Sequence, residues 1–262
     1  MIVDHSGAQW DRLVEQLRAA GCVFAQEEAS ILAEAAHDGA ALAALSARRM
    51  AGEPLEHVVG WVAFAGRRLA VGPGVFVPRR RSEFLAAAAV AAAAPRAMPV
   101  VLEAYCGVAP IAATVRRWLP DAQVYACDTD RRALGYAARN LGGDENIHVG
   151  EGLSALPAEF AHRFDVIAAV VPYVPDAALA LMPHEAIDHE PHLALLGGAA
   201  GLDHLRTIVE QATGWLTDSG ELLLECHRTQ EPELMAHAHA AGFTGRYLEF
   251  AHSATVVLWL TR

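Results

Sequence analysis

The chain has 262 residues, 53% hydrophobic and 19% charged, with a formal net charge of −11 at pH 7. This composition excludes a mostly disordered chain, and the acidic balance argues against broad nucleic-acid binding. The four cysteines show no C-x-x-C spacing, so neither a disulfide framework nor a metal site is expected. Residues 1–6 show no secretory signal, and no apolar run reaches the ~20 residues that span a bilayer. We therefore predict a cytoplasmic protein without membrane contact.

The first part of the chain predicts a small helical bundle and an irregular connector. Leucine, valine and alanine recur at helical spacing over residues 11–20 and 26–49, with Gly39 as a break. Between residues 58 and 78 the pattern changes to short apolar runs punctuated by glycine and proline, which is typical of a hairpin or connector. These changes divide the chain into a helical domain, a connector and a larger domain, at 1–57, 58–78 and 79–262.

The larger domain opens with a helix over residues 82–94, for which Ser82 is the expected N-cap. After it, strands and helices alternate, which argues for a parallel sheet covered on both faces. Strands are expected at 100–104, 123–128, 147–150, 164–170 and 221–225, and helices at 111–118, 131–141 and 202–216. The last strands, 247–250 and 255–260, are too close for a crossover helix and should be antiparallel. The predicted fold class is α/β.

A nucleoside-binding layout occupies the first two strands of this sheet. Gly107 lies in the turn after the first strand, where glycine lets the backbone approach a ligand and the following helix offers free N–H groups. Asp128 ends the second strand, where an acid can hydrogen-bond ribose hydroxyls. The alternative is a tight turn beside an ordinary surface aspartate.

The stretch DVIAAVVPYVP, residues 165–175, predicts a buried strand that stops at a loop. Ligands of open α/β sheets bind beyond the carboxyl ends of the strands, so Val170, Pro172 and Tyr173 should face a site. The following segment, residues 183–191, is rich in titratable groups. Its His184 and His189 are candidate catalytic bases, because histidine titrates near neutral pH.

Several motifs in one order carry a family resemblance. They are GEPLEHVVG at 52–60, FAGR at 64–67, VGPGVFVPRRRSEFL at 71–85, HEPHLALLGGAAGLD at 189–203 and SGELLLE at 219–225. Together they resemble the HemK/PrmC-type protein-glutamine methyltransferases, and in particular a PrmC-related branch. The resemblance implies a class I methyltransferase fold, with a mostly parallel seven-stranded sheet, an antiparallel end hairpin and an N-terminal helical domain.

The resemblance also implies S-adenosylmethionine as cofactor. Glu103 stands at the position of the family's strand-one acid and would approach the amino group of the methionine moiety. Gly107 would admit the cofactor and Asp128 would bind the ribose diol. Cys106 and Thr129 would line the nucleoside.

The chain departs from the family's D-x-G-x-G-x-G pattern. Tyr105 and Ala109 occupy the first and third glycine positions, and Tyr105 would crowd or reshape the methionine end. Glu151 would replace, in a shifted register, the acid that contacts adenine. Arg79 begins an arginine run that can contact anions and is counted with the cofactor-binding residues.

The acceptor motif departs further, because the family's Asn-Pro-Pro-Tyr is Val-Val-Pro-Tyr at residues 170–173. In the family, the asparagine accepts the N–H groups of the substrate glutamine and so aligns a poor nucleophile. Val170 has no acceptor. Three alternatives follow: a methyltransferase acting on a small molecule or another non-glutamine acceptor, a release-factor glutamine methyltransferase that tolerates Val170, and a non-catalytic paralogue that binds the cofactor or a partner.

Overall fold

A seven-stranded sheet lies at the centre of the larger part of the chain, in the order β5-β4-β3-β6-β7-β9-β8. The computed structural model describes residues 7–250 and 253–262, so residues 1–6, where no secretory signal is expected, lie outside it. The strands are β3 (Val100–Ala104), β4 (Gln123–Asp128), β5 (Ile147–Val149), β6 (Phe164–Ala169), β7 (Leu216–His227), β8 (Thr244–Glu249) and β9 (Thr255–Thr261). β3 pairs in parallel with β4 and β6, whereas β9 pairs antiparallel with β7 and β8. This topology confirms the predicted fold class.

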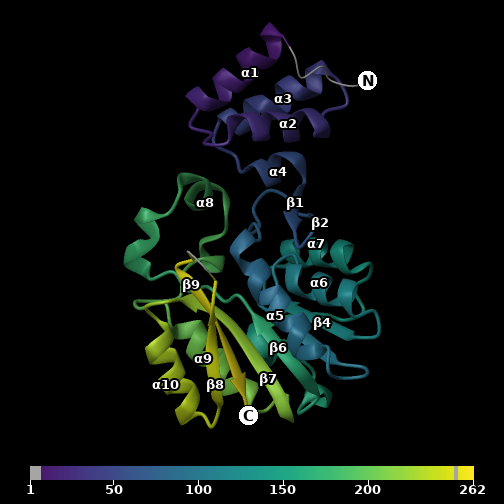
Figure 1. Ribbon diagram of the computed structural model, residues 1–262, viewed down its shortest axis with the longest axis vertical. Helices are drawn as coiled ribbons and strands as arrows, with labels where there is room; N and C mark the ends of the chain where they lie inside the picture. Colours follow the sequence, from purple (N-terminus) through teal and green to yellow (C-terminus); the bar gives the residue numbers. More distant parts are fainter. Residues whose placement is uncertain (1–6, 251–252) are drawn as a thin grey trace.

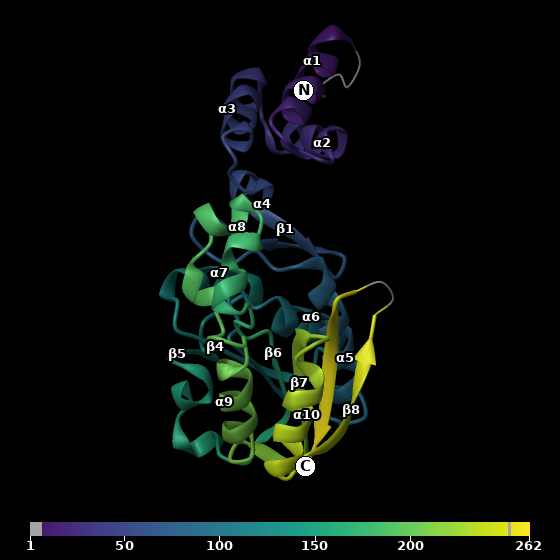
Figure 2. The ribbon, with the colours of Figure 1, turned by 90° about the vertical axis from the view of Figure 1, so that its left-hand side faces the viewer.

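Helices cover both faces of the sheet (Figures 1 and 2). Alternate strand residues point to opposite faces, so Val101 and Val166 pack into one core while Leu102 and Ile167 pack into the other. The first core is covered by α5 (Glu83–Ala93), α6 (Pro110–Trp118) and α7 (Arg131–Leu141), and the second by α9 (Asp203–Ala212) and α10 (Glu231–Ala240). None of the helices within the described ranges is long and apolar enough to cross a membrane.

The N-terminal helices lie at one end of the molecule and pack around a core of their own (Figure 1). They are α1 (Ala8–Ala19), α2 (Ala25–Ala35) and α3 (Gly39–Met50). Trp10, Leu17 and Leu32 are buried between them. A short helix and an antiparallel hairpin lead from this bundle to the sheet; they are α4 (Leu55–Val59), β1 (Trp61–Phe64) and β2 (Arg67–Ala70).

The segment between β6 and α9 lies between the N-terminal helices and the sheet, and it contains α8 (His184–His189) (Figures 1 and 2). A buried ion-pair network ties it to the N-terminal bundle. Arg49 on α3 places Nη1 2.7 Å from Glu185 Oε1 on α8 and Nε 2.6 Å from Glu28 Oε2 on α2. The Arg49 side chain is 7% exposed and that of Glu28 is 11% exposed, so this pair is buried, whereas Glu185 is partly exposed and joins the bundle to α8.

Ser82 directly precedes α5, as predicted, but its side chain does not cap the helix. A 3-10 turn, Arg80–Ser82, runs directly into α5, so Ser82 already has helical dihedral angles and its side chain makes no capping hydrogen bond. Gly39, expected as a break, is instead the first residue of α3. The break covers residues 36–38, and the Asp38 side chain caps α3 by accepting a hydrogen bond from the Ala41 N–H.

Several element boundaries also differ from expectation. The strand expected at 221–225 extends over Leu216–His227, because the chain continues beside β6 through an irregularity in register. As a consequence the preceding helix ends at Ala212 rather than at residue 216. α10 has no predicted counterpart, since its alanine and histidine sequence carries no clear apolar stripe.

Candidate active site

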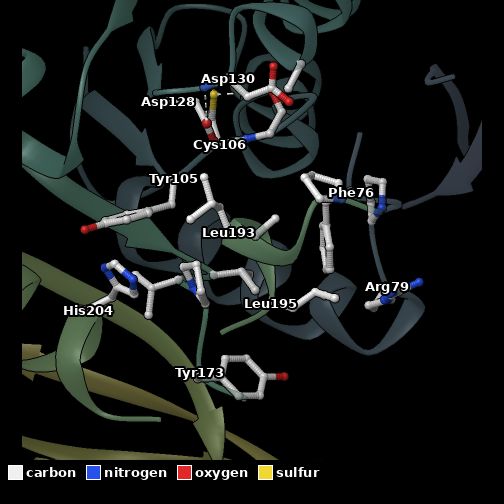
Figure 3. Close-up of a pocket in the computed structure, with 18 of the residues that line it drawn as sticks. Phe76, Arg79, Tyr105, Cys106, Asp128, Asp130, Tyr173, Leu193, Leu195 and His204 are labelled. Atoms are coloured by element: carbon white, nitrogen blue, oxygen red, sulfur yellow. Dashed lines mark hydrogen bonds between the residues drawn. The ribbon is translucent and has the colours of Figure 1, made fainter. Parts of the chain in front are cut away.

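A cavity of about 620 Å³ opens at the carboxyl ends of β3, β4 and β6 (Figure 3). This is the edge at which open α/β sheets bind ligands. Its wall includes most of the site residues predicted from the sequence: Arg79, Glu103, Tyr105, Cys106, Gly107, Asp128, Thr129, Glu151, Val170, Pro172 and Tyr173. The fold therefore gathers at one cavity residues that are spread over about a hundred positions of the sequence.

The turn between β3 and α6 forms one wall of the cavity. The Cys106 N–H donates to the Cys127 carbonyl at 3.0 Å, which fixes the turn to the end of β4. Gly107 has a φ of +53°, and a methyl group placed on it would meet no atom within 4 Å. Glycine adopts this conformation without strain, and its bare backbone leaves open space for a ligand.

Two side-chain-bearing residues in the same turn also have positive φ. The values are +52° for Tyr105 and +59° for Ala109, the positions where the family pattern has glycine. The left-handed region costs a residue with a side chain on the order of 1–2 kcal/mol. At positions 105 and 109 the turn thus keeps the backbone conformation of glycine although both residues carry side chains. Such strain is typical of functional sites.

Asp128 joins the end of β4 to this turn. Its Oδ2 accepts a hydrogen bond from the Gly107 N–H at 2.8 Å, and its Oδ1 accepts one from the Asp130 N–H at 2.9 Å. Burial raises the pKa of the Asp128 carboxyl, although these N–H groups oppose the shift. Each carboxylate oxygen accepts more than one hydrogen bond, so Asp128 retains acceptor capacity towards the cavity.

Glu103 on β3 is buried beside the turn. Its Oε2 accepts a hydrogen bond from the Ala112 N–H in the first turn of α6 at 2.6 Å. Burial raises the pKa of Glu103 to about 8, while the N–H groups of Ala112 and Ile111 act in the opposite direction. At pH 7 the carboxyl is therefore mostly protonated until a cation approaches it.

The Tyr105 side chain lies along the cavity wall, with its hydroxyl directed away from Asp128 and Phe76 (Figure 3). Its ring meets the His204 ring edge to face, with centroids 5.7 Å apart. The hydroxyl lies beside Gly152 and has no hydrogen-bond partner within residues 7–250 and 253–262. Burial raises the pKa of Tyr105 to about 12, so the phenol is neutral.

At the opposite end of the cavity, Tyr173 is held by a charged pair. Its hydroxyl donates to Glu225 Oε1 at 2.8 Å, and Arg81 Nη2 donates to the Tyr173 hydroxyl at 3.1 Å. Arg81 Nε lies 3.3 Å from the same Glu225 oxygen. Burial raises the pKa of Tyr173, so its hydroxyl stays protonated and serves as the donor to Glu225.

Two further contacts hold the loops around this end. Arg79 Nη2 donates to Glu190 Oε2 at 2.6 Å, and burial raises the pKa of Glu190 to about 7 although Arg79 opposes the shift. Gln230 is buried, and its Nε2 donates to the carbonyls of Tyr173 at 3.0 Å and Gly201 at 3.1 Å. These bonds fix the loop after β6 against the loop before α9.

The two histidines predicted as bases lie off the cavity wall. The His184 side chain is 95% exposed on α8, and neither His184 nor His189 is among the cavity-lining residues. His204 on α9 lines the cavity instead. Sequence reasoning named neither His204 nor Glu225 as a site residue, although Glu225 ends a strand that was predicted.

The sheet order, with its antiparallel end hairpin, is that of the class I methyltransferase fold. A methyltransferase from Pyrococcus furiosus shares the fold, with a TM-score of 0.54 and 16% identity over 82% of this chain and 95% of that chain. No protein-family model matches the chain.

Sequence relatives define the family. The chain is 36% identical to a release factor glutamine methyltransferase of Mycolicibacterium smegmatis, over 78% of this chain and 71% of that protein. It is 34% identical to one of Streptomyces coelicolor, over 70% and 66%. It is also 33% identical to a 4-amino-L-phenylalanine/4-methylamino-L-phenylalanine methyltransferase of Streptomyces pristinaespiralis, over 74% and 68%. The chain belongs to the release factor glutamine methyltransferase family and is an S-adenosylmethionine-dependent methyltransferase.

Proposed function

We propose that the end of the cavity formed by β3 and β4 binds S-adenosylmethionine. The cofactor carries an ammonium and a sulfonium, and the acidic groups at this end match that positive charge. Glu103 would bind the ammonium and Asp128 the ribose hydroxyls, while the bare backbone of Gly107 would admit the ligand. The open space at Gly107 and the spare acceptor capacity of Asp128 support this fit. The bound cofactor supplies an electrophilic methyl group.

The remaining cavity residues receive proposed roles from their positions. Cys106 and Thr129 would line the nucleoside as neutral neighbours; burial raises the pKa of the Cys106 thiol, which keeps it protonated. Glu151, after β5, would contact adenine. Tyr105, expected to crowd the methionine end, has its hydroxyl beside Gly152 and would form the wall next to Glu151 instead. We move Arg79 from the cofactor contacts to the acceptor end, because it lies apart from Asp128 and pairs with Glu190 (Figure 3).

Cofactor binding should release a proton from Glu103. The carboxyl holds its proton up to a pKa of about 8 in the free protein, and a bound ammonium favours the ionised form. Affinity for S-adenosylhomocysteine, which also carries the ammonium, should therefore increase as pH rises towards about 8. Calorimetry at pH 7 in buffers of different ionisation enthalpy measures the release. Glu103→Gln should abolish it, and equal proton release by this variant would contradict the assignment.

We propose further that the methyl acceptor is a small molecule or another non-glutamine group. The carrying observation is Val170 on the cavity wall, where the family's asparagine would accept the amide N–H groups of glutamine. A buried amide left unpaired costs about 1–3 kcal/mol, and its delocalised lone pair is not turned towards the methyl group. An amine or phenolate has a lone pair that is available for attack, so the site needs mainly to place this atom next to the methyl group of the cofactor.

The relative from Streptomyces pristinaespiralis supports this proposal, because it is named for methyl transfer to an amino-substituted phenylalanine. The relatives named for release factor glutamine support a second candidate, in which the N-terminal helices contact a protein acceptor. The methyltransferase relatives count against the third alternative, a non-catalytic paralogue that retains the cofactor. We retain the division of the chain into domains at 1–57, 58–78 and 79–262 as a proposal. A cytoplasmic location is also a proposal, supported by the four cysteines, which are buried and unpaired.

An acceptor assay with the intact protein separates these candidates. S-adenosylmethionine with a labelled methyl group is offered with a release factor, and separately with a set of arylamines that includes 4-amino-L-phenylalanine. We expect a higher kcat/KM for an arylamine than for the release factor. A higher kcat/KM for the release factor would overturn the acceptor proposal, and so would cofactor binding without transfer to any arylamine.

A further inference from the structure

The cavity is divided by charge. Acidic side chains line its cofactor end, namely Glu103, Asp128, Asp130 and Glu151. The cationic side chains of the wall, Arg79 and Arg81, belong to the segment that leads into α5. Figure 3 shows Asp128 and Asp130 at one end of the cavity and Arg79 and Tyr173 away from them. A ligand that fills the cavity therefore meets acids beside the cofactor and guanidinium groups beyond the methyl group.

Arg81 is the cation best placed to bind a ligand. A guanidinium has five N–H donors, and the interactions of Arg81 with Tyr173 and Glu225 use only Nε and Nη2. Its Nη1 has no partner among the residues that the structure describes. The Arg81 side chain is 44% exposed while that of Glu225 is 2% exposed, so the free edge of the guanidinium is accessible.

The charge of Arg81 also has a fixed position. Glu225 is anchored on β7, and the Tyr173 hydroxyl bridges the two side chains. A guanidinium held at Nε presents its Nη1 edge with little further loss of side-chain entropy. Planar N–H pairs of this kind match a carboxylate best, because both groups are planar and the hydrogen bonds are charge-assisted.

The wall between the arginines and the cofactor end is apolar. Phe76, Val170, Leu193 and Leu195 line it, and the Leu193 residue is 88% exposed. An apolar side chain so exposed at a cavity gains stability when a ligand covers it. The same surface would not favour a highly hydrated acceptor.

We propose that Arg81 binds the carboxylate of a small acceptor whose body is aromatic or otherwise apolar. This inference rests on the proposed function, since it describes the acceptor of the same site. It places the acidic group of the acceptor on the Nη1 edge of Arg81, its body against Leu193 and Leu195, and its nucleophile towards Val170 and the methyl group.

Binding without methyl transfer tests the inference. The intact protein is saturated with S-adenosylhomocysteine and titrated with phenylacetate, 3-phenylpropionate and 4-phenylbutyrate, each against its own carboxamide. We expect at least one carboxylate to bind about 10-fold or more tightly than its amide, as a charge-assisted hydrogen bond implies. Arg81→Gln should remove this preference. Arg80→Gln is the matched control and should keep it, because Arg80 is the neighbouring arginine and does not line the cavity.

A purely structural role of Arg81 gives a different result. If Arg81 only positions Tyr173, the Arg81→Gln variant weakens each carboxylate and its amide equally and keeps their ratio, which would overturn the proposal. So would equal binding of acid and amide by the unaltered protein, or no binding of any acid. Should Arg81→Gln lose S-adenosylhomocysteine binding, the double variant Arg81→Gln/Glu225→Gln removes the unpaired buried charge and serves for the same comparison.

The result of the carboxylate-binding test can be distinguished from the result of the acceptor assay. A higher kcat/KM for a release factor than for an arylamine would overturn the proposed acceptor class whatever the carboxylate preference. Loss of the preference would overturn the role of Arg81 even if an arylamine is methylated.

Discussion

Replacing Asp128 by alanine is expected to weaken S-adenosylmethionine binding by about 100-fold or more. A hydrogen bond from a ribose hydroxyl to a carboxylate contributes roughly 1.5–3 kcal/mol, and two of them would be lost. The substitution also removes the acceptor that holds the Gly107 N–H at 2.8 Å, so the turn loses the contact that fixes its distance from β4. Calorimetric titration with the cofactor measures the effect directly.

Two controls make the Asp128 result specific. Asp121→Ala removes an exposed carboxylate elsewhere on the chain and should leave cofactor affinity unchanged. Asp128→Asn keeps the size of the side chain and one oxygen acceptor, so its loss of affinity should be intermediate. Cofactor binding by a folded Asp128→Ala protein within a few-fold of the unaltered protein would remove Asp128 from the proposed site.

Introducing asparagine at Val170 is expected to raise methyl transfer to glutamine. The new carboxamide oxygen can accept a substrate N–H that Val170 leaves unpaired, a difference of about 1–3 kcal/mol. Each 1.36 kcal/mol is tenfold in rate, so kcat/KM towards a release factor should rise roughly 5- to 150-fold if the rest of the cavity is competent. Mass spectrometry of the release factor, with initial rates from labelled cofactor, provides the measurement.

The matched control is Val170→Ala, which makes room at the same position without adding an acceptor. It should leave glutamine transfer at the level of the unaltered protein. Equal activity of the asparagine and alanine variants would show that the missing acceptor is not what disfavours glutamine. Cofactor affinity should stay the same in both, because Val170 lies beyond the turn that would hold the nucleoside.

The strands at the centre of the sheet could be predicted from the sequence because their signals are local. β3 and β4 are short apolar runs that end at a glycine turn and at an acid, and their bounds match the expected ones. Because the carboxyl ends of neighbouring parallel strands lie at the same edge of the sheet, these two strands alone predict that Gly107 and Asp128 lie at one cavity. α8 and α10 could not be predicted, since neither shows a one-sided apolar stripe.

Other features of the site depend on tertiary structure. The contact of Arg81 with Tyr173 and Glu225 joins three segments far apart in sequence, and no spacing rule predicts it. The positive φ of Tyr105 could not be predicted from the sequence either, because a tyrosine gives no local signal for a left-handed conformation. His184 and His189 were expected near the cavity because their segment follows a strand end, but neither is among the lining residues, and the position of a loop relative to a cavity depends on tertiary structure.

The buried guanidinium of Arg49 has a consequence for exchanging parts of this enzyme with a relative. Glu185 belongs to the segment after β6, parts of which line the cavity, while Glu28 and Arg49 belong to the N-terminal bundle. Loss of Glu28 would leave the buried Arg49 with only the partly exposed Glu185, and loss of Glu185 would remove the ion pair that joins the two segments. A bundle taken from a relative should therefore carry both an arginine at position 49 and a carboxylate at position 28.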